Sequence, residues 1–394
     1  MVKKLFTGLR GFWLALGVVL MVLLCMEGAS GLFLYVKEGV LRSVDPRAEA
    51  DVYAGAQWTE DFYRTALKMG GVRWHPYVYW RRKAFESEYI NVDKYGVRKT
   101  WNREASAGEK GEPFKIFMFG GSAMWGTGAR DDHTIPSYLS KMLSETIERR
   151  VEVVNYGEMG YVNTQEVAML LYQLRRGNVP DMVIFYDNIN DIGAAAQNRE
   201  AGLTNSEFNR AREFNLLNEV RQQDLYLEAV RSAAKNSPTM RLMKKVLRKI
   251  GLLKKEPPQA GSDGKISDKL ADDIIKVYES NIKMVEALGK EYGFESLFYW
   301  QPIVLDKPHL TPFEKKQARE WMYFKDFYFQ MHGRVDGSGF LSSDPRFRDL
   351  SGIFANAKKP YFIDFCHLGE AGNEIVAENM YEDVLPIIKK RGEQ

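Results

Sequence analysis

The sequence predicts an α/β protein, a three-layer αβα sandwich around a five-stranded parallel sheet, with an N-terminal transmembrane helix and a helical insertion. Three observations support this prediction. Short apolar runs of strand length alternate with segments of helical periodicity from Lys115 onward. The connections between them are short, which favours a parallel sheet with helices on both faces. Residues 1–40 contain an apolar run long enough to cross a bilayer.

The N-terminal segment begins with basic residues and continues as the uncharged run Gly11–Met26. Glu27 interrupts the apolar character, which resumes from Gly28 to Val36. As one helix, residues 11–36 would span roughly 39 Å, against about 30 Å for the bilayer core. The basic residues in front predict a cytoplasmic N-terminus and place the rest of the chain outside.

A cleaved signal peptide is the alternative, with Gly28 and Ser30 as small residues at the cleavage site. Leu24 before Cys25 disfavours lipoprotein processing, because a small residue is normally needed there. We favour the retained anchor. Both alternatives export the domain, so an extracytoplasmic location, periplasmic or at the cell surface, is expected either way.

The composition limits the classes of function. Of the 394 residues, 45% are hydrophobic and 27% charged, which is typical of a globular protein rather than a disordered one. A net charge of +3 argues against nucleic acid as the main partner. The two cysteines, Cys25 and Cys366, lie far apart in the chain, so neither a disulfide framework nor a cysteine-based zinc site is predicted. We expect no cofactor and no metal.

Changes in pattern divide the chain into five segments: an anchor or signal (1–40), an aromatic-rich subdomain (41–112), the first part of the core (113–200), a helical insertion (201–265) and the second part of the core (266–394). In the aromatic-rich subdomain, YVYW (77–80) and YINVDKYGVR (89–98) predict short extended segments with a turn near residues 93–96. In the core, helices are predicted at Thr134–Glu148 and Thr164–Arg175 and strands at 115–119, 151–155, 182–186, 296–300 and 361–363.

The insertion is helical and charged, and it ends in Pro257-Pro258 and a polar linker at 261–264. Apolar residues recur at helical spacing from Met240 to Leu253, and lysines and arginines occupy the other faces. Such a basic amphipathic helix can lie on an anionic membrane surface. A solvated lid helix packed on the core is the alternative that we favour.

A serine follows the first core strand in the segment FGGSAMWG, at the carboxyl edge of the predicted sheet, where ligands bind. The glycines before Ser122 allow a tight turn and a close approach of substrate to the backbone. The Ser122 hydroxyl could attack a carbonyl while its N–H helps to hold the oxyanion. Alone, Gly-Gly-Ser after a strand more often marks a simple turn.

Three further loops carry candidate groups. Asn155-Tyr156-Gly157-Glu158-Met159-Gly160 follows the second strand, and Gly160 could offer an N–H to the same oxyanion. Asn188-Ile189-Asn190-Asp191 follows the third, and Asn190 could donate its side-chain amide. Asp364-Phe365-Cys366-His367 follows the last predicted strand; Asp364 could orient His367 so that its other ring nitrogen takes the serine proton. Each motif alone also has a structural explanation as a loop glycine, a helix cap or a capping histidine.

Together, in the order Ser, Gly, Asn and Asp-x-x-His, these motifs resemble the SGNH hydrolase superfamily, also called GDSL-like lipases and esterases. The resemblance covers about residues 113–200 and 290–390. It implies a flavodoxin-like fold with Ser122 as nucleophile, an oxyanion hole of Ser122, Gly160 and Asn190, and His367 with Asp364 as the relay. Gly121 replaces the usual Asp of the first block and Asn188 the usual Gly of the third, which alters the pocket wall.

Further features resemble a membrane-anchored subset of this superfamily that is associated with surface polysaccharides. They are the apolar N-terminus with its glutamate, His75-Pro76-Tyr77, Asn91-x-x-x-x-Gly96-x-Arg98, and Trp300-Gln301-Pro302, in which Gln301 is a candidate for the pocket beside Gly121 and Asn188. Membrane-bound polysaccharide machinery is therefore an expected partner class.

Other chemistries fit the sequence less well. The α/β-hydrolase elbow needs Gly-x-Ser-x-Gly, but Met124 occupies the last glycine position. No Walker lysine follows the glycines, and the five histidines are dispersed without an HExxH motif. We expect a serine esterase acting on small-acyl, O-acetyl-type esters of exported carbohydrate. An O-acyltransferase with the same residues and a non-catalytic exported scaffold are the alternatives.

Overall fold

Five parallel strands in the order β4-β3-β5-β6-β7 form the central sheet of this computed structural model. The structure describes residues 2–36, 45–106, 109, 111–219, 234, 237–250, 252 and 267–392. The strands are β3 (Phe114–Gly120), β4 (Val151–Asn155), β5 (Met182–Asp187), β6 (Glu295–Trp300) and β7 (Phe347–Asp349). Every residue of the central strand β5 is buried, as expected for a strand covered on both faces. The predicted parallel five-stranded sheet is therefore confirmed.

The fifth strand is not the predicted one. Residues 361–363 form no ladder in the sheet, and Phe362 makes only an isolated antiparallel bridge to Leu368. The backbone N–H groups of Tyr361 and Phe362 donate instead to the Glu314 carboxylate, at 3.0 and 3.3 Å. The backbone of a short buried apolar run can be hydrogen-bonded either by a neighbouring strand or by a side chain. The apolar pattern alone does not distinguish these two cases. The observed edge strand β7 contains a single large apolar residue, Phe347.

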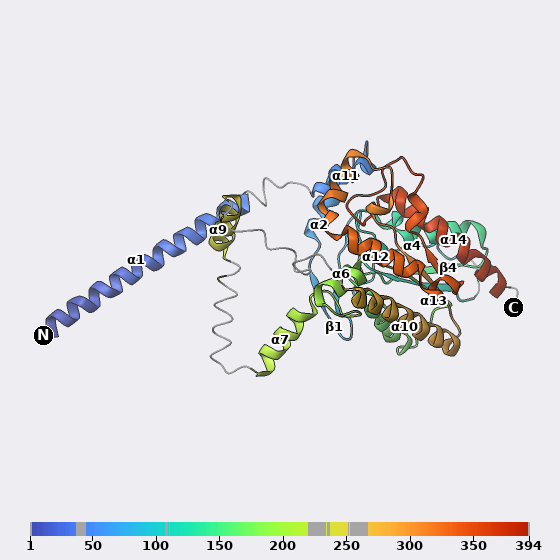
Figure 1. Cartoon of the computed structure of the whole chain (residues 1–394), viewed down its shortest axis with the longest axis horizontal. Coiled ribbons are helices and arrows are strands. Elements are labelled where there is room, and N and C mark those ends of the chain that lie inside the picture. Colours follow the sequence, from blue (N-terminus) through green and yellow to red (C-terminus); the bar gives the residue numbers. More distant parts are fainter. Residues whose placement is uncertain are drawn as a thin grey trace. The chain divides into compact units, whose positions relative to one another are not determined.

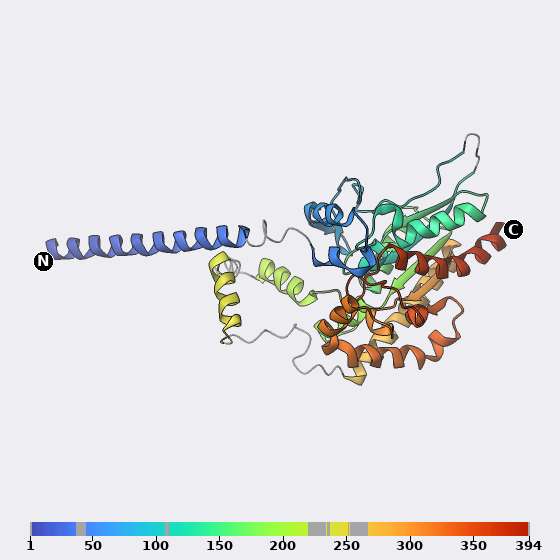
Figure 2. The same cartoon turned by 90° about the horizontal axis from the view of Figure 1, so that it is seen from above.

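Helices cover both faces of the sheet (Figures 1 and 2). On one face, α4 (Ile135–Thr146) lies beside α14 (Glu370–Gly392). Both pack on alternate strand residues such as Ile116 and Met118. On the other face, α5 (Asn163–Leu174), α10 (Asp268–Tyr292) and α12 (Lys325–Asp336) bury Phe117, Phe119 and their neighbours. The alternation of side chains along each strand thus supplies two cores, one per face.

The two helices predicted for the core's first part are confirmed as α4 and α5, with ends that differ by one or two residues. Thr134 is the N-cap of α4, and its hydroxyl accepts from the Ser137 N–H at 3.3 Å. Further helices of the second compact unit and its border are α2 (Thr59–Lys68), α3 (Ser122–Trp125), α6 (Ile189–Asn198), α7 (Glu207–Glu219), α11 (Pro312–Glu320) and α13 (Gly339–Ser343). Short 3₁₀ helices lie at Pro46–Glu49, Asp51–Tyr53, Asp131–His133, Val304–Asp306, Met322–Phe324 and Ser351–Phe354.

In the aromatic-rich subdomain, β1 (Val72–His75) and β2 (Tyr79–Arg82) form an antiparallel hairpin. Tyr77, predicted to be extended, instead lies in the turn with a φ of 69°. The predicted turn near Asp93 is present: the Asp93 carboxylate accepts from the N–H groups of Tyr95 and Val97, both at 2.8 Å.

The chain divides into two compact units, Met1–Asp45 with Phe208–Pro257, and Pro46–Glu207 with Pro258–Gln394. In the first unit, α1 (Val2–Leu34) packs against α9 (Pro238–Lys249). Residues Gly11–Leu34 are long and apolar enough to cross a membrane, by length and composition. Glu27 accepts from the Ser237 hydroxyl at 2.6 Å and the Thr239 N–H at 3.2 Å. The predicted break at Pro257-Pro258 and the linker at 261–264 lie outside the described residues.

Candidate active site

Ser122 lies at the carboxyl end of β3, where α3 begins. The strand ends at Gly120, and a side chain there would meet the carbonyl oxygen of Tyr186 on β5 at 2.8 Å. A glycine at this position lets the chain turn closely over the neighbouring strand. The turn leaves the serine hydroxyl at the edge of the sheet.

The serine is hydrogen-bonded to a histidine that is distant in sequence. Ser122 Oγ lies 2.6 Å from His367 Nε2, and His367 Nδ1 lies 2.7 Å from Asp364 Oδ2. Burial alone would raise the pKa of Asp364, but the neighbouring His367 and two backbone N–H groups lower it to about 2. Asp364 is therefore an ionised carboxylate at neutral pH, and Arg47 lies 3.5 Å from it.

The spacing Asp-x-x-His has a local explanation. Asp364 Oδ1 accepts from the backbone N–H groups of Cys366 (3.0 Å) and His367 (2.9 Å), which folds the loop so that the other carboxylate oxygen reaches the imidazole. This loop does not follow a strand of the sheet, contrary to the prediction. It is held by the Ile363 N–H donating to the His367 carbonyl at 2.9 Å and by the Val304 N–H donating to Phe365 at 2.8 Å.

The three groups predicted for an oxyanion hole lie at the ends of β3, β4 and β5. Neither the Ser122 N–H nor the Gly160 N–H donates to any acceptor among the described residues, and the same holds for the Asn190 side-chain amide. Unused donors at a strand edge are what an oxyanion requires. Gly160 has a φ of +76°, a conformation that favours glycine.

Asn190 and Gly121 lie in direct contact. A Cβ placed on Gly121 would lie 2.1 Å from Asn190 Nδ2. Glycine at this position, where the SGNH pattern that the sequence resembles usually has aspartate, thus makes room for the amide.

Asn188, the second departure, has a φ of 157°, where glycine is usual. Its amide donates to the Gln301 carbonyl at 2.8 Å and to the Tyr328 hydroxyl at 3.1 Å. Asn188 and Gln301 are 1% and 4% exposed, so they brace the loop after β5 from within.

The loop after β4 is attached to the serine turn. Asn155 accepts from the Gly157 N–H at 3.0 Å and donates to the Met124 carbonyl of α3 at 3.1 Å. A Cβ on Gly157 would lie 2.5 Å from the backbone nitrogen of Trp125. The Asn-x-Gly part of the motif therefore joins the two loops that carry Ser122 and Gly160.

Two buried arginines from the aromatic-rich subdomain support these loops, and no catalytic role was predicted for either. Arg81 donates to the Tyr156 carbonyl at 2.9 Å and lies 3.8 Å from the buried Glu158 carboxylate. Burial raises the pKa of Glu158, although Arg81 and other groups offset this in part. Arg81 thereby holds the loop that leads to Gly160.

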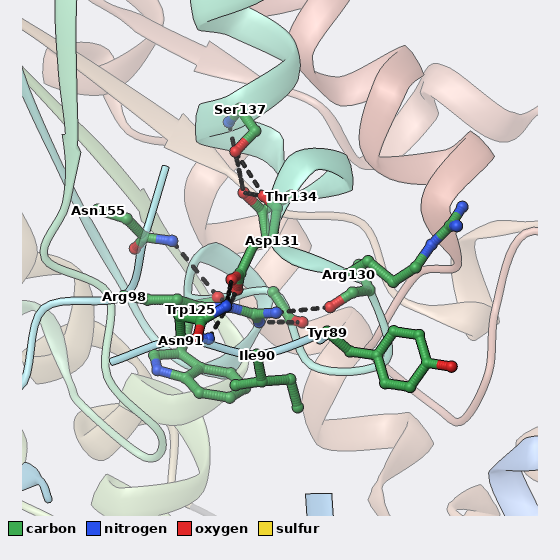
Figure 3. A network of polar contacts seen from close by, with 12 residues as sticks. Tyr89, Ile90, Asn91, Arg98, Trp125, Arg130, Asp131, Thr134, Ser137 and Asn155 are labelled. Atoms are coloured by element: carbon green, nitrogen blue, oxygen red, sulfur yellow. Dashed lines mark hydrogen bonds and ion pairs between the residues drawn. The ribbon is translucent and has the colours of Figure 1, made fainter. Parts of the chain in front are cut away.

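Arg98 performs the same task at the serine turn (Figure 3). It donates to the carbonyls of Trp125 (2.9 Å), Gly126 (2.7 Å) and Ala129 (2.6 Å), and its Nε bonds Asp131 at 3.0 Å. Asn91 binds the other oxygen of Asp131 at 2.8 Å. The Asn91…Arg98 motif of the sequence therefore holds the segment after Ser122 in place. This motif is the sequence signal from which the role of Arg98 could have been predicted.

A cluster of buried carboxyl groups lies behind the Asn190 loop. Asn163 links two of them: its amide donates to Asp187 at 2.8 Å, and its N–H donates to Asp191 at 3.0 Å. Burial raises the pKa of Asp187 to about 6, and burial together with Asp187 raises the pKa values of Glu166 and Asp191. The neutral forms of these acids are favoured by the fold.

Among the described residues, one group has donor atoms that could hold a metal ion. It consists of Asp364, Cys366 and His367, with donor atoms within 4.8 Å of one another. Two of these residues already form the hydrogen-bonded relay to Ser122, which is sufficient to explain their proximity.

No family model and no curated protein match the chain. Solved structures similar to it include an acetyl xylan esterase (15% identity, TM-score 0.37, covering 68% of this chain and 99% of that one). A lipolytic protein of the G-D-S-L family from Desulfitobacterium hafniense (10%, 0.33, 68% and 98%) and a lipase/acylhydrolase from Enterococcus faecalis (12%, 0.35, 68% and 94%) are also similar.

Proposed function

We propose that this chain is an SGNH-type serine esterase that forms an acyl-enzyme on Ser122. The observation that carries the proposal is the relay of two short contacts, 2.6 Å from Ser122 Oγ to His367 Nε2 and 2.7 Å from His367 Nδ1 to Asp364 Oδ2. A nucleophile, a base and an orienting acid within hydrogen-bond reach are the signature of acyl transfer. A non-catalytic scaffold would not need this alignment.

In the first step, Ser122 Oγ attacks the ester carbonyl while its proton passes to His367 Nε2. The carbonyl π electrons move to oxygen, and the negative charge is held by the Ser122 N–H, the Gly160 N–H and the Asn190 amide. When the carbonyl re-forms, the C–O bond to the alcohol breaks. The leaving alkoxide takes the proton from His367, and the acyl group remains on the serine.

In the second step, a hydroxyl compound repeats the sequence in reverse. His367 removes its proton, the oxygen attacks the acyl-enzyme, and Ser122 leaves with the proton returned by His367. Water as acceptor gives an esterase, and a sugar hydroxyl gives an O-acyltransferase. The same residues serve both reactions, so the acceptor decides the activity.

The proposed substrates are small-acyl, O-acetyl-type esters of carbohydrate outside the cytoplasm, with the chain retained in the membrane by α1. The contacts of Glu27 with Ser237 and Thr239 support retention, because cleavage near residues 28–30 would remove the partner of α9. A buried or interfacial carboxylate that is hydrogen-bonded to a second helix costs less than an unpaired one. Association with membrane-bound polysaccharide machinery remains a prediction.

The nucleophile can be tested with a fluorophosphonate probe, which reacts with activated serines. Wild type should be labelled and Ser122→Ala should not. Ser280→Ala, which removes an exposed serine on α10, is the matched control and should label as wild type. Equal labelling of Ser122→Ala and wild type would overturn the assignment, and no labelling of any variant would favour the scaffold.

The acceptor and the anchor need separate assays. Acetate release from p-nitrophenyl acetate, measured with and without added oligosaccharide, distinguishes hydrolysis from transfer through the appearance of acetylated sugar. For the anchor, mass spectrometry of the membrane fraction should find the full-length chain. A soluble chain shortened by about 30 residues would instead indicate a cleaved signal peptide.

A further inference from the structure

A cavity lies away from Ser122, between the β1–β2 hairpin and α5, and has a volume of about 700 Å³. Its floor is made by paired residues of the two strands: Lys115 lies opposite Glu152, and Phe117 opposite Val154. These residues belong to the first half of β3 and to β4, whereas Ser122 lies beyond the far end of β3. At about 3.3 Å per strand residue, Phe117 is on the order of 15 Å from the serine turn.

The cavity wall carries more positive than negative charge. Arg73, Arg81, Lys115 and Arg176 line it, against Asp93 and Glu152. Arg81 and Lys115 already have carboxylate neighbours outside the cavity, Glu158 and Glu112, each at 3.8 Å. Arg73 and Arg176 are exposed, and neither has a carboxylate partner among the described residues. Arg73 donates to the Lys94 carbonyl at 2.5 Å and Arg176 to the Tyr172 hydroxyl at 3.0 Å, so both keep free guanidinium donors. Free, planar guanidinium groups favour carboxylates, which they bind through two parallel hydrogen bonds.

The two acids offset part of this positive charge. The Asp93 carboxylate is engaged by backbone N–H groups in its own turn. Burial lowers the pKa of His75 in the wall, and the nearby Arg81, Arg73 and Arg176 add to this, against a hydrogen bond to Pro76 that raises it. The imidazole is therefore neutral at neutral pH, packed on Tyr172 at 4.7 Å between ring centroids. The cavity can accept a negative charge without first displacing an internal ion pair.

Aromatic rings stand at the rim. Trp74 is 69% and Tyr95 59% exposed, although large aromatic side chains are usually covered. Exposed aromatics beside a cavity indicate a ligand with apolar faces, because an aromatic surface left in water costs free energy that a ligand can recover. A sugar ring has such faces, formed by its C–H groups, and it carries hydroxyls that suit Gln173 and Asn178 in the same wall.

We propose that this cavity is a second glycan-binding site that holds an acidic polysaccharide through its carboxylate-bearing sugars. The sugar rings lie against Trp74 and Tyr95, and their carboxylates pair with Arg73 and Arg176. The choice of a glycan among anionic ligands rests on the proposed esterase function. The charge of the cavity and its aromatic rim are observed independently of that function. The site would retain a polymer on the enzyme while its ester groups are presented to Ser122.

The test is isothermal titration calorimetry on the full-length chain in detergent micelles. The Ser122→Ala variant is used because it cannot turn over an ester. The probes are hexagalacturonate, neutral xylohexaose and inorganic phosphate. Hexagalacturonate should bind, and tighter at low than at high salt because exposed charges are screened. Arg73→Ala/Arg176→Ala should weaken its Kd roughly 10-fold or more, as should Trp74→Ala, if each lost contact contributes about one decade.

The matched control is Arg149→Ala/Arg319→Ala, which removes two exposed arginines that do not line the cavity and changes the net charge equally. It should bind hexagalacturonate like the parent. Thermal unfolding and circular dichroism of each variant establish that the fold is intact.

Four results would overturn the proposal. Three concern the ligands: no saturable binding of hexagalacturonate, equal binding of xylohexaose, or phosphate competing at equal concentration of charge. The fourth is loss of hexagalacturonate binding in the control variant as well, which would mean that only the net charge of the protein matters. Because binding is measured without turnover, it can fail while fluorophosphonate labelling of wild type succeeds. If hexagalacturonate binds but the fluorophosphonate labels nothing, the esterase proposal fails and the proposed binding site stands.

Discussion

Nδ2 of Asn190 occupies the space that a side chain on Gly121 would need, with only 2.1 Å between it and an ideal Cβ. Gly121 has an extended backbone with a φ of −76° and a ψ of −151°, and a negative φ does not by itself require glycine. The requirement comes from the amide of Asn190. The glycine and the amide of the proposed oxyanion hole therefore depend on each other.

Gly121→Ala should displace the Asn190 amide and lower kcat for p-nitrophenyl acetate by roughly 10²-fold, as expected for the loss of one oxyanion donor. Gly121→Asp, which installs the residue usual in the SGNH pattern that the sequence resembles, should be at least as harmful. Asn190→Ala should lower kcat by roughly 10²–10³-fold.

Gly193→Ala is the matched control, because a Cβ there meets nothing within 4 Å. It should keep full activity. If the glycine acts through Asn190, the double variant Gly121→Ala/Asn190→Ala should be little worse than Asn190→Ala alone. Full activity of Gly121→Ala would contradict the relationship.

Asp364→Asn should lower kcat by about 10³–10⁴-fold, because the amide cannot hold His367 in the tautomer that accepts the serine proton. The pKa of Asp364 is about 2, so the carboxylate is ionised throughout pH 5–9 and the deficit should be constant across that range. Initial rates from pH 5 to 9 measure it. Asp273→Asn, on the surface of α10, is the control. A deficit that vanishes at pH 5 would contradict a role for the ionised carboxylate.

Arg98→Ala should destabilise the protein by about 3–5 kcal/mol, because it leaves the buried Asp131 carboxylate without its cation and three carbonyl oxygens without donors. Lysine at position 98 has the charge but not the planar fork, so it should recover only part of the loss. Denaturant unfolding measures both. Arg103→Ala removes a part-exposed arginine and should change stability little. Equal effects of the two alanine variants would argue against this role of Arg98.

Asp187→Asn should alter the pH dependence of stability. The folded-state pKa of Asp187 is raised to about 6, so its stabilising contribution is complete below about pH 3.8 and is lost as the pH rises to about 6. Asparagine does not titrate, so the Tm of the variant minus that of wild type should increase from pH 4 to 7. Calorimetric melts at half-unit intervals would show this. A difference that stays constant or falls would contradict the burial argument.

The fold and the candidate site differ in how far the sequence predicts them. Strands β3 to β6 were predictable because their apolar runs are bounded by polar turns, and α4 and α5 because their periodicity is regular. The sequence analysis assigned the fifth strand to residues 361–363 in place of the observed edge strand β7. Both segments are short, and only their pairing partners distinguish a strand from a loop there. Ser122, Asn190 and Gly160 could be placed because parallel strands bring their carboxyl ends to one edge.

The sequence by itself determined that Ser122 follows a strand, and it determined which residues could act with this serine. The tertiary structure alone decided that Ser122 and His367, 245 residues apart, lie 2.6 Å from each other. It alone decided that Arg81 and Arg98 hold the loops, and that Gly121 yields its space to Asn190. Local sequence specifies turns and periodicity, whereas contacts across the chain depend on how separate elements pack, which no local pattern encodes.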